Sequence, residues 1–161
     1  MLPELVLDLL QRQHGAVADH QLLALEPADR RRVRRHPDLV RASPRTWRHL
    51  AVPPTAEQQL VLSVLDTGPA AVLWGKSGAS HWGFSRYRRL PAHVGVARTR
   101  VRGPRLAQVH RIRDLDPGDI VTHLDVPTCR PERIILWLAG MMTHRYGHEV
   151  AVERMGVVLD Q

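Results

Sequence analysis

The sequence is poor in cysteine and has no long apolar run, and each scarcity excludes a class of protein. Cys129 is the only cysteine, which excludes an intrachain disulfide framework or thiolate zinc site and suits a reducing cytoplasm. No apolar stretch is long enough to cross a membrane, and residues 1–10 carry Glu4 and Asp8 where a signal peptide has basic residues. We therefore expect a cytoplasmic protein with no membrane partner.

Lysine is equally scarce, because Lys76 is the only one and the net charge of +7 comes almost entirely from arginine. An arginine skew by itself is typical of a GC-rich genome, but here the charge is also unevenly placed. Residues 28–50 carry a net +6 and residues 84–113 carry +9 with no acid, whereas the remaining segments are net negative. Genome composition does not produce such blocks, whereas a surface that binds phosphate does.

Residues 1–52 are predicted to form a winged helix-turn-helix DNA-binding domain. Apolar residues at helical spacing predict a helix over residues 5–10. A short second helix is expected over residues 20–25, and a third helix is expected from Pro27 to about His36. Residues 39–50 are then expected to form a hairpin.

Residues 53–161 are predicted to form a small α/β antitoxin-like domain, so the whole chain falls in the α+β class. Thr55 is expected to cap a helix with one apolar stripe, and a short apolar run and a glycine- and serine-rich turn or helix follow. Strands are expected at residues 93–98, 107–112 and 120–122, and helices at residues 131–142 and 147–159.

The third helix is the candidate element for reading DNA. If Val33 faces the core, a rotation of about 100° per residue places three arginines opposite it. Arginine reaches both phosphates and the acceptor edge of guanine in the major groove. The alternative is a solvated arginine-rich helix, but the turn before it and the basic hairpin after it favour DNA. The candidate DNA-binding residues are Arg30, Arg31, Arg34 and Arg35 on the helix and Arg41, Arg45 and Arg48 on the hairpin.

The second basic block is a further candidate interface. Nine arginines without an acid favour an extended DNA footprint or a dock for an acidic partner or an RNA-binding toxin, and the sequence does not separate these possibilities from one another. A solvated loop is the alternative. The residues are Arg86, Arg88, Arg89, Arg98, Arg100, Arg102, Arg105, Arg111 and Arg113.

Enzymatic chemistry is not expected. Residues 70–77 nearly match a phosphate-binding loop that ends in Lys76-Ser77, but bulky apolar residues stand where such a loop needs glycine. A metal-dependent nuclease needs paired carboxylates near a lysine, and Lys76 has no acid within several residues. We therefore predict no catalytic residue and no cofactor.

Metal binding is not expected either. His144 and His148 are four residues apart, but Gly147 interrupts the helix and no third ligand has suitable spacing. The aspartates around Pro117-Gly118 are ordinary turn-formers. Trp74, Trp82 and Trp137 lie on apolar segments and are expected to pack in the core.

The order of these segments resembles the AbiEi family of antitoxins, in which a winged helix precedes a small α/β domain. The similarity covers almost the whole chain, although Trp74-Gly75-Lys76 and Trp137 depart from the family's usual residues. Among the matching positions are His14-Gly15, the run from Arg30 to Arg34, Pro44 with Trp47, Gly68-Pro69, Trp82-Gly83, Val109-His110-Arg111 and Val126-Pro127.

The resemblance implies a DNA-binding antitoxin of a type IV toxin–antitoxin system. Such a protein represses its own promoter and is paired with a nucleotidyltransferase-like toxin encoded nearby. Two alternatives stay open: a plain transcription regulator without a toxin, and the non-catalytic N-terminal portion of a protein that continues into a Vsr-like endonuclease domain.

Overall fold

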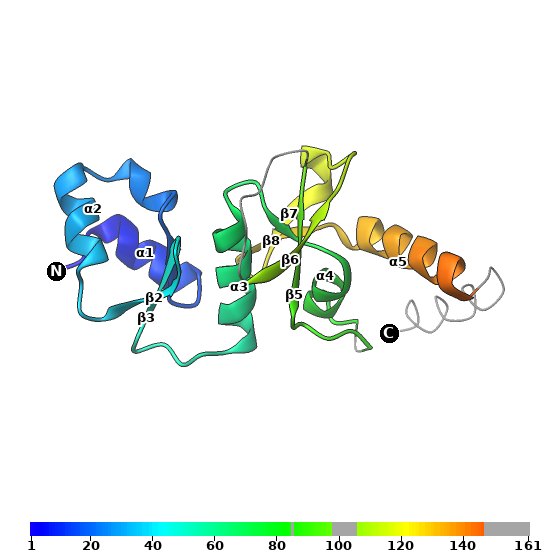
Figure 1. Cartoon of the computed structure of the whole chain (residues 1–161), viewed down its shortest axis with the longest axis horizontal. Helices are drawn as coiled ribbons and strands as arrows, with labels where there is room; N and C mark the ends of the chain where they lie inside the picture. Colours follow the sequence, from blue (N-terminus) through cyan, green and yellow to red (C-terminus); the bar gives the residue numbers. More distant parts are fainter. Residues whose placement is uncertain (85, 98–105, 147–161) are drawn as a thin grey trace.

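The computed structural model describes residues 1–84, 86–97 and 106–146. These residues form two β-sheets with helices around them, which confirms the expected α+β class. From the N-terminus onward, the layers are the N-terminal helices, a three-stranded sheet, helix α3, a five-stranded sheet, and a layer of α4 and α5 (Figure 1). The second predicted helix of the C-terminal region, residues 147–159, lies outside the described residues.

The N-terminal part follows the predicted order of helices and hairpin. Its elements are α1 (Glu4–Arg12), β1 (Ala16–Ala18), the 3-10 helix η1 (Gln21–Ala24), α2 (Pro27–Arg34), β2 (Leu39–Ser43) and β3 (Thr46–His49). The antiparallel sheet has the order β1-β3-β2. Strand β1 was not predicted, because three buried residues are too few to show the alternation that marks a strand.

The helices of this part cover one face of the sheet. Val6 and Leu10 of α1, Leu22 of η1 and Val33 of α2 pack with Trp47 of β3 in one core. The expected second helix is only a 3-10 turn, because Pro27 opens the next helix three residues after η1 ends. This core fixes how α2 sits on the hairpin.

Helix α3 (Ala56–Thr67) is buried on both sides. The predicted cap is confirmed, since the Thr55 side chain accepts a hydrogen bond from the Gln58 backbone N–H at 3.1 Å. The expected single apolar stripe is too narrow a description, because almost every residue from Gln58 to Thr67 is buried. Ala16 and Ala18 of the first sheet share a core with α3 and with Leu73 and Val94 of the second. The boundary predicted at residue 52 stays a prediction.

The second sheet is mixed, as expected for an α/β region. Its elements are β4 (Val72–Leu73), α4 (Gly75–His81), β5 (Ala92–Val96), β6 (Ala107–Arg111), the 3-10 helix η2 (Pro117–Asp119), β7 (Ile120–His123), β8 (Val126–Cys129) and α5 (Pro131–Tyr146). The strand order is β6-β5-β4-β8-β7, with β4 parallel to β8 and β5 parallel to β6. The three expected strands are confirmed as β5, β6 and β7.

The two faces of the second sheet carry different layers. Leu73 and Val94 point toward α3, whereas their neighbours Val72 and Trp74 pack with Ile134 and Leu138 of α5. Within the described ranges, no helix is long and apolar enough to cross a membrane.

Candidate nucleic-acid interface

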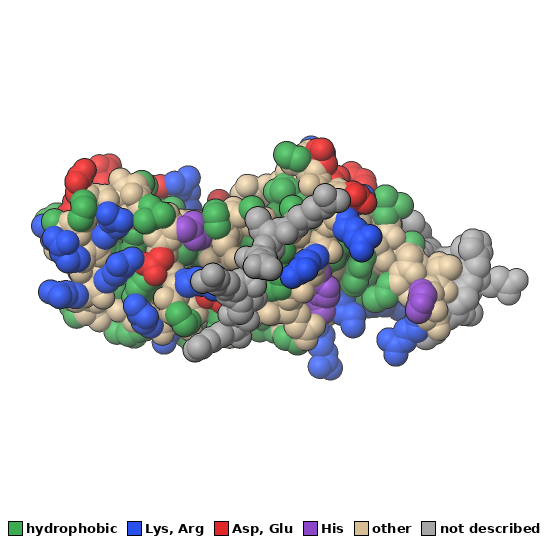
Figure 2. Space-filling view, turned by 45° about the horizontal axis from the view of Figure 1, so that its top comes forward, with side chains coloured by type: hydrophobic (Ala, Val, Ile, Leu, Met, Phe, Trp, Pro, Cys, Tyr) green, Lys and Arg blue, Asp and Glu red, His purple; other side chains and the backbone are tan. Residues whose placement is uncertain are grey.

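Helix α2 presents its arginines as the rotation argument predicts. Val33 is buried in the core at 1% exposure, and Arg31, Arg34 and Arg35 are exposed. Arg30 is half-buried at the flank. Figure 2 shows arginine side chains gathered at the N-terminal end of the molecule.

Two arginines of this helix are held by nearby acids. Arg34 donates from Nε to Asp19 at 3.0 Å and forms an ion pair with it, and Arg32 pairs with Asp29. Among the described residues, Arg31 and Arg35 make no ion pair. They are the cations of α2 that are most available to phosphate or to a base edge.

Trp47 links α2 to the hairpin. The Arg34 guanidinium lies 5.9 Å from the centroid of its ring, and the Arg41 guanidinium lies 5.2 Å from it. Two cations from different elements are thereby held against one buried indole. The sequence indicated an aromatic residue in the hairpin, but the two guanidinium contacts depend on how α2 packs and have no local signal.

The hairpin arginines, all predicted to contact DNA, do not share one face. Arg48 lies opposite Ala16 and Val40 in the sheet register, and Ala16 belongs to the core on the α3 side. Because side chains alternate along a strand, Arg48 points to the α3 side of the sheet, whereas Arg41 shares the face of its register partner Trp47. Only Arg41 therefore continues the α2 surface.

The hairpin tip is bound to α3. Asp66, which is 2% exposed, accepts a hydrogen bond from the Ser43 hydroxyl, and Ser43 also contacts the Thr46 hydroxyl at 2.9 Å. Arg45 donates to the Asp66 backbone oxygen at 3.0 Å. This residue, predicted to touch DNA, is engaged within the molecule.

The second basic block is divided by the fold. Arg98, Arg100, Arg102 and Arg105 lie outside the described residues. Arg89 forms an ion pair with Glu57 of α3. The remaining arginines fall into two groups at different cavities, so the described part of the block is not one continuous face.

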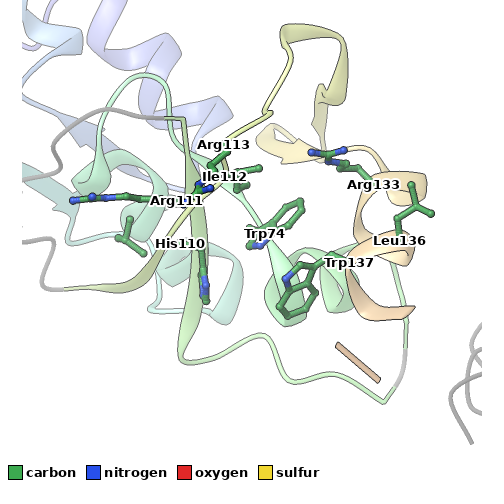
Figure 3. Close-up of a pocket in the computed structure, with 9 residues that line it drawn as sticks. Trp74, His110, Arg111, Ile112, Arg113, Arg133, Leu136 and Trp137 are labelled. Carbon is green, nitrogen blue, oxygen red and sulfur yellow. The ribbon is translucent and has the colours of Figure 1, made fainter. Parts of the chain in front are cut away.

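The first cavity, here called the tryptophan cavity, has a volume of about 630 Å³ and lies between β6 and α5. Arg111 and Arg113 line it together with Arg133 of α5. Figure 3 shows the rings of Trp74 and Trp137 side by side, with Arg133 and Leu136 projecting from α5 and Arg111 pointing away from both rings. Trp74 is buried as predicted, but half-buried Trp137 faces the cavity.

The second cavity, here called the basic cavity, has a volume of about 510 Å³. Lys76 of α4, Arg86 and Arg88 line it, with Arg145 of α5 and an apolar part that includes Met141. Among the residues that the structure describes, no acidic residue lines either cavity. The sequence indicated the charge of Arg86 and Arg88 but not that Lys76 lies beside them.

A hydrogen-bonded pair of histidines lies between the two cavities. His93 lines the basic cavity and His110 the tryptophan cavity, and His93 Nδ1 lies 2.8 Å from His110 Nε2. Burial lowers the pKa of both imidazoles below 6.5, and the nearby His110 and Lys76 lower the pKa of His93 further. The neutral forms of both rings are therefore favoured at neutral pH, and one ring donates an N–H to the other.

The arrangement around Ser77 does not resemble a nucleotide-binding loop. A strand, β4, does precede α4, but the Ser77 hydroxyl is buried, donates to the Arg89 backbone oxygen at 2.7 Å and accepts from the His93 backbone N–H at 2.8 Å. It has no freedom to bind a phosphate-bound metal.

Other candidates for chemistry are structural. Burial raises the pKa of the Cys129 thiol to about 12, which makes it a poor nucleophile. Asp116 and Asp119 form a capping box around the η2 turn, as expected of turn-forming aspartates. Within the described residues, no group of three or more His, Cys, Asp or Glu side chains is arranged to hold a metal, and His148 lies outside them.

No family model matches the chain, and no curated protein matches it either.

Proposed function

We propose that the N-terminal part of this chain is a winged helix-turn-helix that binds double-stranded DNA, with α2 in the major groove. The observation that carries the proposal is the exposed arginine face of α2 opposite Val33, continued by Arg41 on the hairpin. The order of three helices and a hairpin on an antiparallel sheet, β1-β3-β2, supports it.

The arginines are expected to make two kinds of contact with DNA, to base edges and to phosphates. Arg31 and Arg35 form no ion pair in the described part of the chain and are the candidates for contacts with base edges. Arg34 and Arg41 are fixed over Trp47 and suit contacts with the phosphate backbone beside the groove. Arg45 and Arg48 are assigned no direct role, because one is bound to α3 and the other lies on the opposite face of the sheet.

The test is binding of the protein to its own upstream DNA and to a scrambled duplex, over a range of salt concentrations. Changing Arg31, Arg34 and Arg35 together to alanine should reduce affinity by about 100-fold or more, because each lost guanine contact costs about 1–3 kcal/mol. Circular dichroism should show an unchanged fold, since exposed helix positions accept alanine.

The hairpin supplies a matched control for this experiment. Arg41→Ala should lower the salt slope by about 0.9, the effect of one lost phosphate contact, whereas Arg48→Ala should leave the slope unchanged. If the wild type and a folded triple variant bind DNA with equal affinity, α2 is not part of the DNA interface.

We also propose that the protein acts as an antitoxin and as a repressor of its own promoter. This part rests on the resemblance to AbiEi-family antitoxins, not on geometry. Co-expression with a nucleotidyltransferase-like neighbour is the direct test. Toxicity that this protein does not relieve would contradict the antitoxin role and would leave two alternatives, a plain transcription regulator and the non-catalytic N-terminal portion of a Vsr-like endonuclease protein.

A further inference from the structure

The tryptophan cavity and the basic cavity lie next to each other along α5. Arg133 and Trp137 from the first turns of α5 line one, and Met141 and Arg145 from its last turns line the other. The hydrogen-bonded His93 and His110 join the two linings. The two neighbouring cavities are together called the sheet–α5 groove.

We propose that the sheet–α5 groove binds a single strand of nucleic acid, RNA or DNA, with phosphates on Lys76, Arg86 and Arg88 and a base stacked on Trp137. The proposal concerns a different surface from α2. It does not depend on the DNA-binding function proposed above.

The positive charge that the described residues gather in the basic cavity is the first support. Lys76, Arg86 and Arg88 are exposed, line one cavity and make no ion pair within the described ranges. Like charges gathered in one hollow repel each other, and an anion that enters offsets that repulsion. Lys76 lies on α4, and Arg86 and Arg88 lie on the segment before β5. Cations from two segments can contact successive phosphates of one strand.

The aromatic residue beside this charge is the second support. Trp137 is half-buried, and its ring is tilted by 58° against Trp74 at 5.8 Å. Gly75 lies under this ring, since a Cβ at that position would be 3.2 Å from it. The protein thus supports the Trp137 ring on one side, and the ring also borders the cavity. Aromatic side chains that border a groove in this way stack on the bases of single strands.

The shape of the groove favours a single strand over a duplex. The cations line a hollow, whereas a duplex offers its phosphates on the outside of a wide cylinder and keeps its bases stacked inside. Volumes of about 630 and 510 Å³ are in the range of sites for drug-sized ligands, so each cavity has room for a nucleotide unit. The neutral His93 and His110 offer hydrogen bonds without charge.

The experiment is fluorescence anisotropy of the full chain with labelled oligo-dU and oligo-U of about 12 nucleotides. The wild type should bind at low salt, and binding that differs between oligo-dU and oligo-U identifies the preferred sugar. Changing Lys76, Arg86 and Arg88 to alanine should abolish binding at moderate salt and lower the salt slope by about 0.7 for each phosphate contact. Trp137→Ala should weaken binding about 5- to 150-fold, and Trp137→Phe should restore most of it because a phenyl ring still stacks.

A variant on the other surface separates this proposal from the first. The Arg31, Arg34 and Arg35 alanine variant should lose duplex binding and keep its affinity for the oligonucleotides, and the groove variant should do the reverse. If the α2 variant loses oligonucleotide binding while the groove variant keeps it, the groove is not the site. Absence of binding by the wild type, displacement by a mononucleotide as effective as the oligonucleotide, or equal displacement by poly-glutamate would each overturn the proposal.

Discussion

Single residues decide where this chain bends. Gly15, between α1 and β1, has φ of +76°, and a Cβ there would lie 2.6 Å from Val52 Cγ2. Its carbonyl accepts a hydrogen bond from the His49 backbone N–H at 2.7 Å. The turn therefore needs both the left-handed backbone and the missing side chain that glycine provides.

Two glycine substitutions should have opposite effects on stability. Gly15→Ala should lower the free energy of unfolding by more than about 1 kcal/mol from the backbone alone, with the Val52 contact adding to the loss. Gly140 is exposed in α5, and a Cβ there would meet no described residue within 4 Å apart from its chain neighbours and the backbone of its own helix, so Gly140→Ala should raise the free energy of unfolding by about 0.5–1 kcal/mol. Urea denaturation measures both. A Gly15→Ala protein as stable as the wild type would contradict this account of the turn.

Residue patterns predicted some contacts and could not predict others. The exposed face of α2 followed from helical rotation around Val33, which needs no tertiary information. The stacking of Arg34 and Arg41 on Trp47, and the bonds from Asp66 to the hairpin, join residues from separate elements. No local pattern encodes such contacts, because they depend on how the elements pack.

At the scale of elements, the parallel pair β5 and β6 carries a titratable contact. Burial lowers the pKa of His93 and His110, so their neutral forms are favoured in the folded protein. Below pH 6.5, the ordinary value, the unfolded chain takes up protons that the folded chain does not. The contribution of these two histidines to the free energy of unfolding is therefore complete above pH 6.5. It is lost as the pH falls from 6.5 toward their lowered pKa values in the folded protein.

This linkage predicts that the free energy of unfolding is lower in mild acid than at neutral pH. The urea concentration at half-unfolding should decrease as the pH is lowered from about 7.5 to about 5.5. Most carboxylates titrate below this range and do not contribute to the change. A His93→Gln, His110→Gln variant should show a smaller fall. Some pH dependence should persist, because burial also lowers the pKa of His20 and His81. An unchanged pH dependence in this variant would show that the pair does not carry the effect.

Element lengths explain which elements the sequence predicts. The helices α1, α3 and α5 show periodic apolar residues or a cap, and their positions were predicted from these signals. Strands β1 and β4 have three and two residues, and β8 contains Pro127, so none of them shows a clear alternation. The second basic block looked continuous because sequence spacing cannot reveal that Arg89 pairs with Glu57 of α3.

At the scale of the molecule, α3 packs against both sheets. Ala16 and Ala18 of β1 share one core with Leu60 of α3 and with Val94 of β5. Removing either sheet would expose a face of α3 that is apolar and buried in the intact chain. The two halves are therefore expected to unfold together.

Native-state hydrogen exchange tests this cooperativity. The slowest amides of β3, α3 and β5 should exchange with one common opening free energy, because each depends on the shared core. Amides of β3 that open at a clearly lower free energy than those of α3 and β5 would instead support an independent domain that ends at residue 52.

A helix packed between two sheets also links what binds on either side of it. Asp66 of α3 holds the hairpin tip, and Glu57 at the other end of the helix pairs with Arg89, next to Arg88 of the basic cavity. If a ligand on one side displaced α3, the free energy of binding on the other side would change, and this coupling would be reciprocal. If a strand in the sheet–α5 groove raises the affinity for a duplex tenfold, the duplex raises the affinity for that strand by the same factor, about 1.4 kcal/mol.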